Sequence, residues 1–344
     1  MQKTLYRLLP LLILTVLFTA LSGCTQSEQA GIVVVYTSVD QPVSEPILEA
    51  FTAETGIEIQ AVYDVEAAKT TGLVNRLIAE KDNPQADVFW NGEFAQTILL
   101  KEEGVLQPYW SPDAADIPSY YKDEDGTWTA FAGRARVFIV NIDLLNPDEY
   151  PDSIEDMLDP VYPADRIGIA YPLFGTAATH AASLYVEMGE VDARSFFEAL
   201  AARGVQVVDG NSVVRDLVAA GELAFGLTDT DDACAAVENG EPVAIVFPDQ
   251  GEGERGTLVL PNTVAMINGA PHREEAQAFI DYLLSVETAQ ELIESGWSQL
   301  SLRPLSVSPG CVDTSAVRTM PVGLIEIYQQ FEPVKQELMD IFIR

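Results

Sequence analysis

Acidic side chains gather in one short segment of the chain. Residues 228–232 read Thr-Asp-Thr-Asp-Asp, at the end of a strand predicted over 225–228. Neighbouring carboxylates repel one another, so either some are protonated or a cation neutralises them. Asp229, Asp231 and Asp232 therefore indicate a site for a metal ion or an organic amine. The alternative is a helix N-terminus, which stabilises negative charge by about 0.3–1 kcal/mol.

Two further carboxylates follow strands near the beginning of the chain. Asp40 comes after the apolar run 32–36, and Glu93 comes after the strand predicted over 86–90. Ligands of open α/β sheets bind beyond the carboxyl ends of strands, so we expect these carboxylates to converge with segment 228–232 on one cleft. Carboxylate oxygens suit hard cations. The metal ligands predicted in this way are Asp40, Glu93, Asp231 and Asp232.

Other polar residues are expected to line the same cleft. Arg134 and Arg136 stand out because basic residues are scarce, and Arg136 begins a predicted strand. Its guanidinium could hold a ligand carboxylate, a phosphonate or the anion that accompanies a metal, or it could form a salt bridge to one of the many acids. Asn211 opens a predicted helix and could assist. The first strand ends at Tyr36, Thr37 and Ser38, which are also assigned to the site.

The charge balance excludes whole classes of function. The 344 residues include 19 Lys and Arg against 53 Asp and Glu, a net charge of -34. Such a chain does not bind nucleic acid, since little could neutralise a phosphate backbone. The sequence has no H-E-x-x-H or G-x-S-x-G motif, so we predict a binding protein and not an enzyme. The rival interpretation is an exported hydrolase that uses paired carboxylates.

Apolar runs alternate with segments of helical spacing, which predicts an α/β fold with doubly wound sheets. The strands are expected at 32–36, 57–63, 86–90, 137–141, 167–170, 205–208, 225–228, 243–247 and 256–266. The helices are expected at 46–54, 67–80, 93–103, 176–188, 213–220, 274–285, 287–295 and 322–341. A chain of this length forms two lobes.

The first residues are typical of a secretory signal. Lys3 and Arg7 precede the apolar stretch 8–21, and Leu-Ser-Gly-Cys24 follows. This tetrad resembles a bacterial lipobox, in which the cysteine receives a diacylglycerol; an ordinary cleaved signal is the alternative. We therefore predict a signal peptide over 1–23, a linker over 24–30 with lipid on Cys24, and an exported protein held at the cell membrane, facing the periplasm or the extracellular side.

Two other cysteines, Cys234 and Cys311, could form a disulfide in an oxidising compartment or remain two buried thiols.

The motifs in their order resemble the ferric-ion-binding branch of the extracellular solute-binding proteins that serve ABC importers. The matching stretches are 35–38 (VYTS), 51–57 (FTAETGI), 86–90 (ADVFW), 104–108 (GVLQP), 133–137 (GRARV), 211–213 (NSV), 221–227 (GELAFGL) and 276–280 (AQAFI). The resemblance implies a type II periplasmic-binding fold, in which two crossing strands join the lobes. The lobes would comprise residues 31–135 with 266–344, and residues 136–265. It also implies an ABC permease as partner; we expect a monomer without a cofactor.

The resemblance bears on the ligand as well. Iron-binding members commonly present two adjacent tyrosines where Asp231 and Asp232 stand here, and some present a histidine where Asp40 stands. Gly175-Thr176 resembles the turn with which the family holds an anion. The implied ligand is Fe³⁺ or another metal cation with an accompanying anion. The alternative is an aminated small molecule such as an aminophosphonate.

Overall fold

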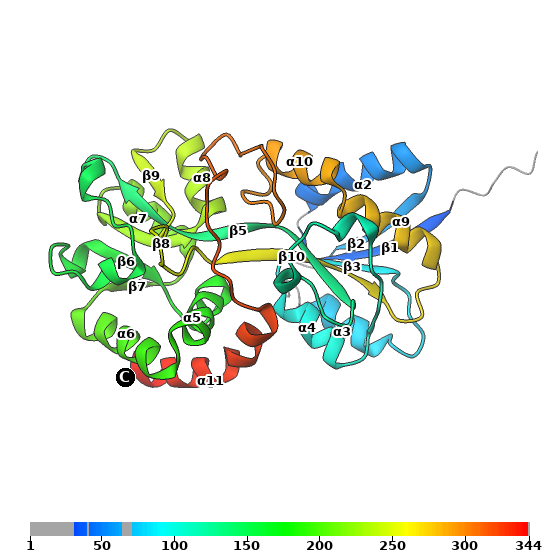
Figure 1. Ribbon diagram of the computed structural model, residues 1–344, viewed down its shortest axis with the longest axis horizontal. Coiled ribbons are helices and arrows are strands. Elements are labelled where there is room, and N and C mark those ends of the chain that lie inside the picture. Colours follow the sequence, from blue (N-terminus) through cyan, green and yellow to red (C-terminus); the bar gives the residue numbers. More distant parts are fainter. Residues whose placement is uncertain (1–30, 40, 64–70, 343–344) are drawn as a thin grey trace, which may run out of the picture. The chain divides into compact units, whose positions relative to one another are not determined.

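The computed structural model describes residues 31–39, 41–63 and 71–342 (Figure 1). The predicted signal peptide, linker, lipidated Cys24 and Asp40 lie outside the described residues. No helix in the described part of the chain is long and apolar enough to cross a membrane.

One group of strands is parallel at its centre. In this group β1 pairs in parallel with β2 and β3, and β10 pairs antiparallel with β3 and β4. Its strands are β1 (Ile32–Thr37), β2 (Glu58–Tyr63), β3 (Val88–Asn91), β4 (Leu106–Gln107) and β10 (Val259–Ile267). The helices α2 (Gln41–Thr55), α3 (Thr71–Ala79), α4 (Ala95–Glu102), α9 (Arg273–Leu283) and α10 (Val286–Glu294) accompany it. Phe51 of α2 packs edge-on against Phe279 of α9, with ring centroids 5.2 Å apart.

The second group is built in the same way. Its strand β6 pairs in parallel with β7 and β8. The strands are β6 (Ile167–Ala170), β7 (Gln206–Val208), β8 (Phe225–Asp229) and β9 (Val243–Val246), and the helices are α5 (Gly175–Met188), α6 (Glu190–Arg203), α7 (Asn211–Ala219) and α8 (Thr230–Glu238). Short 3-10 helices cover Pro112–Ala114, Ser119–Tyr121, Pro147–Glu149, Ile154–Leu158 and Ala164–Arg166.

One long strand joins the two groups. β5 (Trp128–Asn141) pairs with β10 from Trp128 to Ala135 and then with β8 from Arg136 onward. The hydrogen-bonded path therefore runs β2-β1-β3-β10-β5-β8-β6-β7, and Figure 1 shows β5 and β10 between the two groups. This arrangement confirms the predicted fold class, two doubly wound α/β lobes joined by two crossing strands.

The last helix lies in segment 266–344, which we assigned to the first lobe, and also packs against helices of segment 136–265. α11 (Leu324–Phe342) lies along α5 and α6, at the lower edge of Figure 1. The hydroxyl of Tyr185 donates to Glu337 at 2.6 Å, and Arg194 pairs with the same carboxylate at 2.5 Å. α11 therefore packs mainly against helices from segment 136–265 and makes fewer contacts with α4 of the first lobe.

β5 and α6 differ most from the prediction, and α2 begins at Gln41, five residues before the predicted helix at 46. β5 begins at Trp128, nine residues before the predicted strand at 137, because its first half is held by the ladder to β10. α6 occupies Glu190–Arg203, where we predicted no element, and it buries Phe196, Phe197 and Leu200. Its buried residues Ala193, Phe196, Phe197 and Leu200 have helical spacing, so the sequence carried a signal that the prediction did not use.

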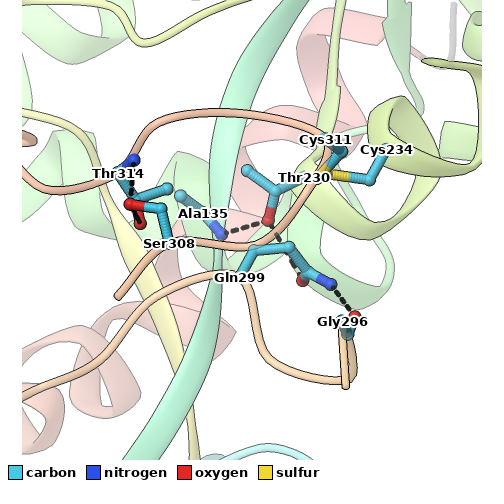
Figure 2. The surroundings of a disulfide bond; sticks show 8 residues. All are labelled: Ala135, Thr230, Cys234, Gly296, Gln299, Ser308, Cys311 and Thr314. Carbon is cyan, nitrogen blue, oxygen red and sulfur yellow. Dashed lines mark hydrogen bonds between the residues drawn. A yellow bond between two sulfur atoms is a disulfide. The ribbon is translucent and has the colours of Figure 1, made fainter. Parts of the chain in front are cut away.

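Cys234 and Cys311 form a disulfide, with Cα atoms 5.3 Å apart (Figure 2). It ties α8 to the irregular segment that precedes α11, over a sequence separation of 77 residues. Nearby, Thr230 accepts a hydrogen bond from the Ala135 amide and contacts Gln299. The two cysteines are therefore paired in a disulfide and are not two buried thiols.

Candidate functional site

A cavity of about 610 Å³ lies where the crossing strands meet α8. Its walls come from the ends of β1 and β3, from β5 and β10, from one face of α8 between Asp231 and Glu238, and from residues 296–299. Ser38, Glu93 and Asp231, all predicted site residues, line it together with Arg134 and Asn262. The fold thus brings part of the predicted set together from distant segments.

Arg134 is the only cationic side chain among the described residues that line this cavity. Its Nε atom lies 3.5 Å from Asp229 Oδ2 and 3.9 Å from Asp231 Oδ2, and its side chain is 25% exposed. Burial alone would lower the guanidinium pKa, but the carboxylates of Asp229, Asp231 and Glu93 outweigh it and raise that pKa. Arg134 is therefore a permanent positive charge that faces the cavity.

Arg136, the arginine assigned to the ligand by the sequence, is 1% exposed and lies away from this cavity. Its Nη1 atom donates to Asp229 Oδ1 at 2.6 Å and to Asn211 Oδ1 at 3.0 Å. The other oxygen of Asp229 accepts from Thr176 Oγ1 at 2.6 Å and from Asn211 Nδ2 at 3.0 Å. The salt-bridge interpretation of Arg136 is thus the one the structure supports.

Asp229 stands at the N-cap position of α8 but does not cap that helix. Its backbone is extended (φ -100°, ψ 155°) and its side chain makes no capping hydrogen bond. The carboxylate points instead to the first turns of α5 and α7, where Thr176 and Asn211 lie. Gly175, which begins α5, has φ +54°, a left-handed conformation that favours glycine.

Glu93 uses both carboxylate oxygens at the start of α4. They accept hydrogen bonds from the backbone amides of Ala95 at 2.9 Å and Gln96 at 3.1 Å. Burial raises the pKa of the carboxyl group, against the opposing effect of these two amides and of Arg134. Glu93 therefore anchors α4 as well as lining the cavity.

Of the three residues at the end of β1, Ser38 alone lines this cavity. The Ser38 hydroxyl donates to Asn91 Oδ1 at 2.6 Å and accepts from the Gly92 amide at 3.0 Å. Tyr36 is buried against α3, with its hydroxyl 3.1 Å from Glu80. The hydroxyl of Thr37 accepts from the Val39 amide at 3.0 Å. Tyr36 and Thr37 thus make contacts within the fold and do not line this cavity, and their role in ligand binding stays a prediction.

Asp231 and Asp232 diverge at the start of α8. Asp231 is 53% exposed and faces Arg134, whereas Asp232 pairs with Arg215 at 3.1 Å. Burial, reinforced by the negative charges of Asp231 and Asp229, raises the pKa of Asp232 to about 6. The described part of the chain contains no group of three or more His, Cys, Asp or Glu side chains placed to hold a metal ion. The predicted metal set, whose fourth member is Asp40, gains no support from the described residues.

A second cavity, of about 960 Å³, shares Glu93 and Arg134 with the first. It lies among α4, α11 and the beginning of α5, where Gly175 and Thr176 line it. The predicted site residues are therefore divided between two connected spaces and the buried cluster around Asp229.

Sequence reasoning missed several residues of the first cavity, among them Glu238, Asn262, Trp297 and Gln299. Asn262 and Thr263 are polar residues inside the otherwise apolar strand β10, and this contrast was a usable signal. Trp297 and Gln299 lie in an irregular segment whose sequence carries no comparable signal.

Comparisons with known proteins agree on the kind of molecule. A family model described as "Bacterial extracellular solute-binding protein" matches residues 83–309. Iron uptake protein A1 of Synechocystis sp. is 30% identical, over 79% of this chain and 79% of that protein. A putative 2-aminoethylphosphonate-binding periplasmic protein of Salmonella typhi is 29% identical, over 72% and 71%. The solved structure of a Trichodesmium protein in complex with iron and citrate has a TM-score of 0.79 at 23% identity, covering 90% of this chain and 98% of that one.

Proposed function

The chain belongs to the bacterial extracellular solute-binding protein family, and from this premise we propose that it is the lipid-anchored receptor of an ABC importer for iron(III) bound to an organic anion. Proteins of this family bind solutes for transport and are not enzymes. In the proposed cycle the receptor captures its ligand in the cavity around Arg134, closes over it and delivers it to a membrane permease.

The single observation that carries the ligand proposal is the pairing of opposite charges on one cavity wall. Arg134 can hold a carboxylate of the ligand through a forked pair of hydrogen bonds. Asp231, exposed beside it, offers hard oxygen atoms to a cation. A metal complex with an organic anion presents both charges. The Synechocystis relative named for iron uptake and the Trichodesmium complex with iron and citrate support this choice.

A second candidate ligand is a zwitterionic aminophosphonate. Among the described residues no cluster of three or more side chains suits a metal ion, and a single molecule could place its phosphonate on Arg134 and its ammonium on Asp231. The Salmonella relative, named as a putative 2-aminoethylphosphonate-binding protein, supports this alternative.

Thermal unfolding of the mature chain distinguishes between the two candidate ligands. We would measure the melting temperature with ferric citrate, citrate alone, divalent metal ions, polyamines and 2-aminoethylphosphonate. A specific ligand at a hundredfold excess over its Kd adds about 2.7 kcal/mol to the free energy of unfolding. Stabilisation by ferric citrate and not by citrate supports the iron proposal. Stabilisation by the aminophosphonate alone replaces it, and no stabilisation by any probe contradicts both.

Closure is proposed to take place about the two crossing strands, between lobes comprising residues 31–135 with 266–344 and residues 136–265. β5 changes pairing partner between Ala135 and Arg136, so a small backbone rotation there would move one strand group against the other. A fall in the radius of gyration on adding ferric citrate, measured by solution X-ray scattering, is the expected result.

The membrane anchor rests on the lipobox-like tetrad that ends at Cys24. Cys24→Ser is expected to move the full chain from the membrane fraction to the soluble exported fraction. An unchanged distribution of the variant would contradict the anchor.

A further inference from the structure

One carboxylate collects hydrogen bonds and charges from several elements. Asp229 accepts from Arg136 at 2.6 Å, from Thr176 at 2.6 Å and from Asn211 at 3.0 Å, with Arg134 Nε at 3.5 Å. These partners come from β5, α5 and α7, and Asp229 itself precedes α8. The Asp229 side chain is only 4% exposed, so these contacts replace water.

The surroundings of this carboxylate suit an oxyanion. Three helices begin here, and helix N-termini favour negative charge. Two guanidinium groups flank the same point, and Nε of the fully buried Arg136 has no hydrogen-bond partner among the residues that the structure describes. A phosphate or a ligand carboxylate could use the hydroxyl, amide and guanidinium donors that Asp229 now uses.

An additional anion at this point of the native chain would meet positive charges that are already neutralised by carboxylates. Asp229 already neutralises Arg136, and Asp231 approaches Arg134 from the cavity side. A second negative charge among these carboxylates would be repelled, and the short contacts to Asp229 leave its donors engaged. Among the described residues of the first cavity, the anionic group of a ligand therefore keeps only Arg134 as a cationic partner.

We propose that Asp229 is a built-in counter-anion that determines selectivity: its carboxylate occupies the anion position shared by α5, α7 and α8 and excludes free oxyanions from it. A consequence follows for the transported ligand: its anionic group contacts Arg134 and not the turn at Gly175. This consequence rests on the proposed function. The exclusion of oxyanions does not rest on it.

The test removes the carboxylate and supplies inorganic phosphate in its place. Asp229→Ser leaves a neutral, smaller side chain, and Asp229→Asn leaves a neutral one of the same size. We expect phosphate at a hundredfold excess over its Kd to raise the melting temperature of Asp229→Ser by roughly 5 °C. Asp229→Asn should respond less because its amide fills the space, and the parent chain should not respond.

A control variant identifies the donors. Thr176→Val in the Asp229→Ser background should abolish most of the phosphate response, whereas Asp232→Asn in the parent chain should create none. Phosphate stabilisation of the parent chain, or an Asp229→Ser protein that folds and ignores phosphate, would overturn the proposal.

Misfolding of Asp229→Ser is itself informative. In that case the variant would be refolded in phosphate and in chloride at equal ionic strength. Recovery in phosphate alone supports the built-in anion, and equal failure in both salts overturns it. Because no transported ligand enters this experiment, its outcome is independent of the thermal panel that tests the proposed function.

Discussion

Arg134 and Arg136 illustrate what residue-level reasoning can predict here. Residues two apart on a strand face the same side, and both arginines do approach Asp229, at 3.5 Å and 2.6 Å. The sequence does not say which of the two is covered. Thr176 and Asn211, in the first turns of α5 and α7, cover Arg136, whereas Arg134 stays at the cavity. The burial of Arg136 therefore depends on contacts with residues 40 and 75 positions away in the sequence.

The shifted pKa of Asp232 predicts how stability depends on pH. Burial raises this pKa from 3.8 to about 6, so between these values the folded chain binds more protons than the unfolded chain. Stability contributed by this group therefore falls as pH rises from about 4 to 6, and the loss is complete above pH 6. We expect Asp232→Asn to exceed the parent in free energy of unfolding by roughly 1–3 kcal/mol at pH 7.5.

Chemical denaturation at pH 4 and pH 7.5 checks this expectation. The advantage of Asp232→Asn should shrink toward zero at pH 4, where the parent carboxyl is protonated. Asp216→Asn is the matched control, because Asp216 contacts the same Arg215 at 2.8 Å but is 67% exposed; its effect should stay within about 0.5 kcal/mol. A variant that is less stable than the parent at pH 7.5 would contradict the assigned pKa shift.

At the scale of elements, the strand and helix order was predictable and the packing of α11 was not. Buried β-branched runs such as 32–36 identify their strands from local pattern alone. The first half of β5 mixes small residues with Trp128, Phe131 and Arg134 and shows no such run, and it becomes a strand through its ladder to β10. α11 is amphipathic, which predicts a helix but does not identify its partner.

α11 contacts both strand groups through different halves. Before Pro333, Phe331 packs against Phe94 next to α4, and Tyr328 donates to Glu102. After Pro333, Glu337 binds Tyr185 and Arg194. Proline has no amide hydrogen and weakens the helix at this point, so the proposed closure would bend α11 there.

Pro333→Ala is expected to stiffen this helix. Alanine restores a backbone donor, so the melting temperature should rise by about 2–5 °C. The stiffer helix should resist closure, and the affinity for ferric citrate should fall several-fold in titration calorimetry. Gln336→Ala, at an exposed position of the same helix, is the control and should change neither quantity by much. Unchanged affinity with a raised melting temperature would show that α11 does not bend during closure.

At the scale of the whole molecule, the sequence identified the family and the fold but not the ligand. Family and fold depend on many buried positions, a large share of which local patterns reveal. Ligand choice depends on a few side chains, and of the predicted site residues that the structure describes only Ser38, Glu93 and Asp231 line the first cavity. The residues that complete it, Asn262 among them, are brought there by the crossing strands and by the segment before Cys311.

The net charge of -34 gives Arg134 its importance. A strongly acidic protein repels free anions at long range, so an anionic group binds only where a local positive charge outweighs that field. Among the described residues of the first cavity, only Arg134 provides such a positive charge. The proposed binding of an anionic ligand group therefore requires the Arg134 side chain.

Calorimetric titration of Arg134→Gln tests the account most directly. The ligand would be whichever of ferric citrate and 2-aminoethylphosphonate stabilises the parent chain. The account predicts at least about a 30-fold loss of affinity, as expected when one partner of a desolvated charge pair is removed. Arg215→Gln, which changes a salt bridge outside the cavity, should bind like the parent. Parental affinity in a folded Arg134→Gln variant would contradict the central claim.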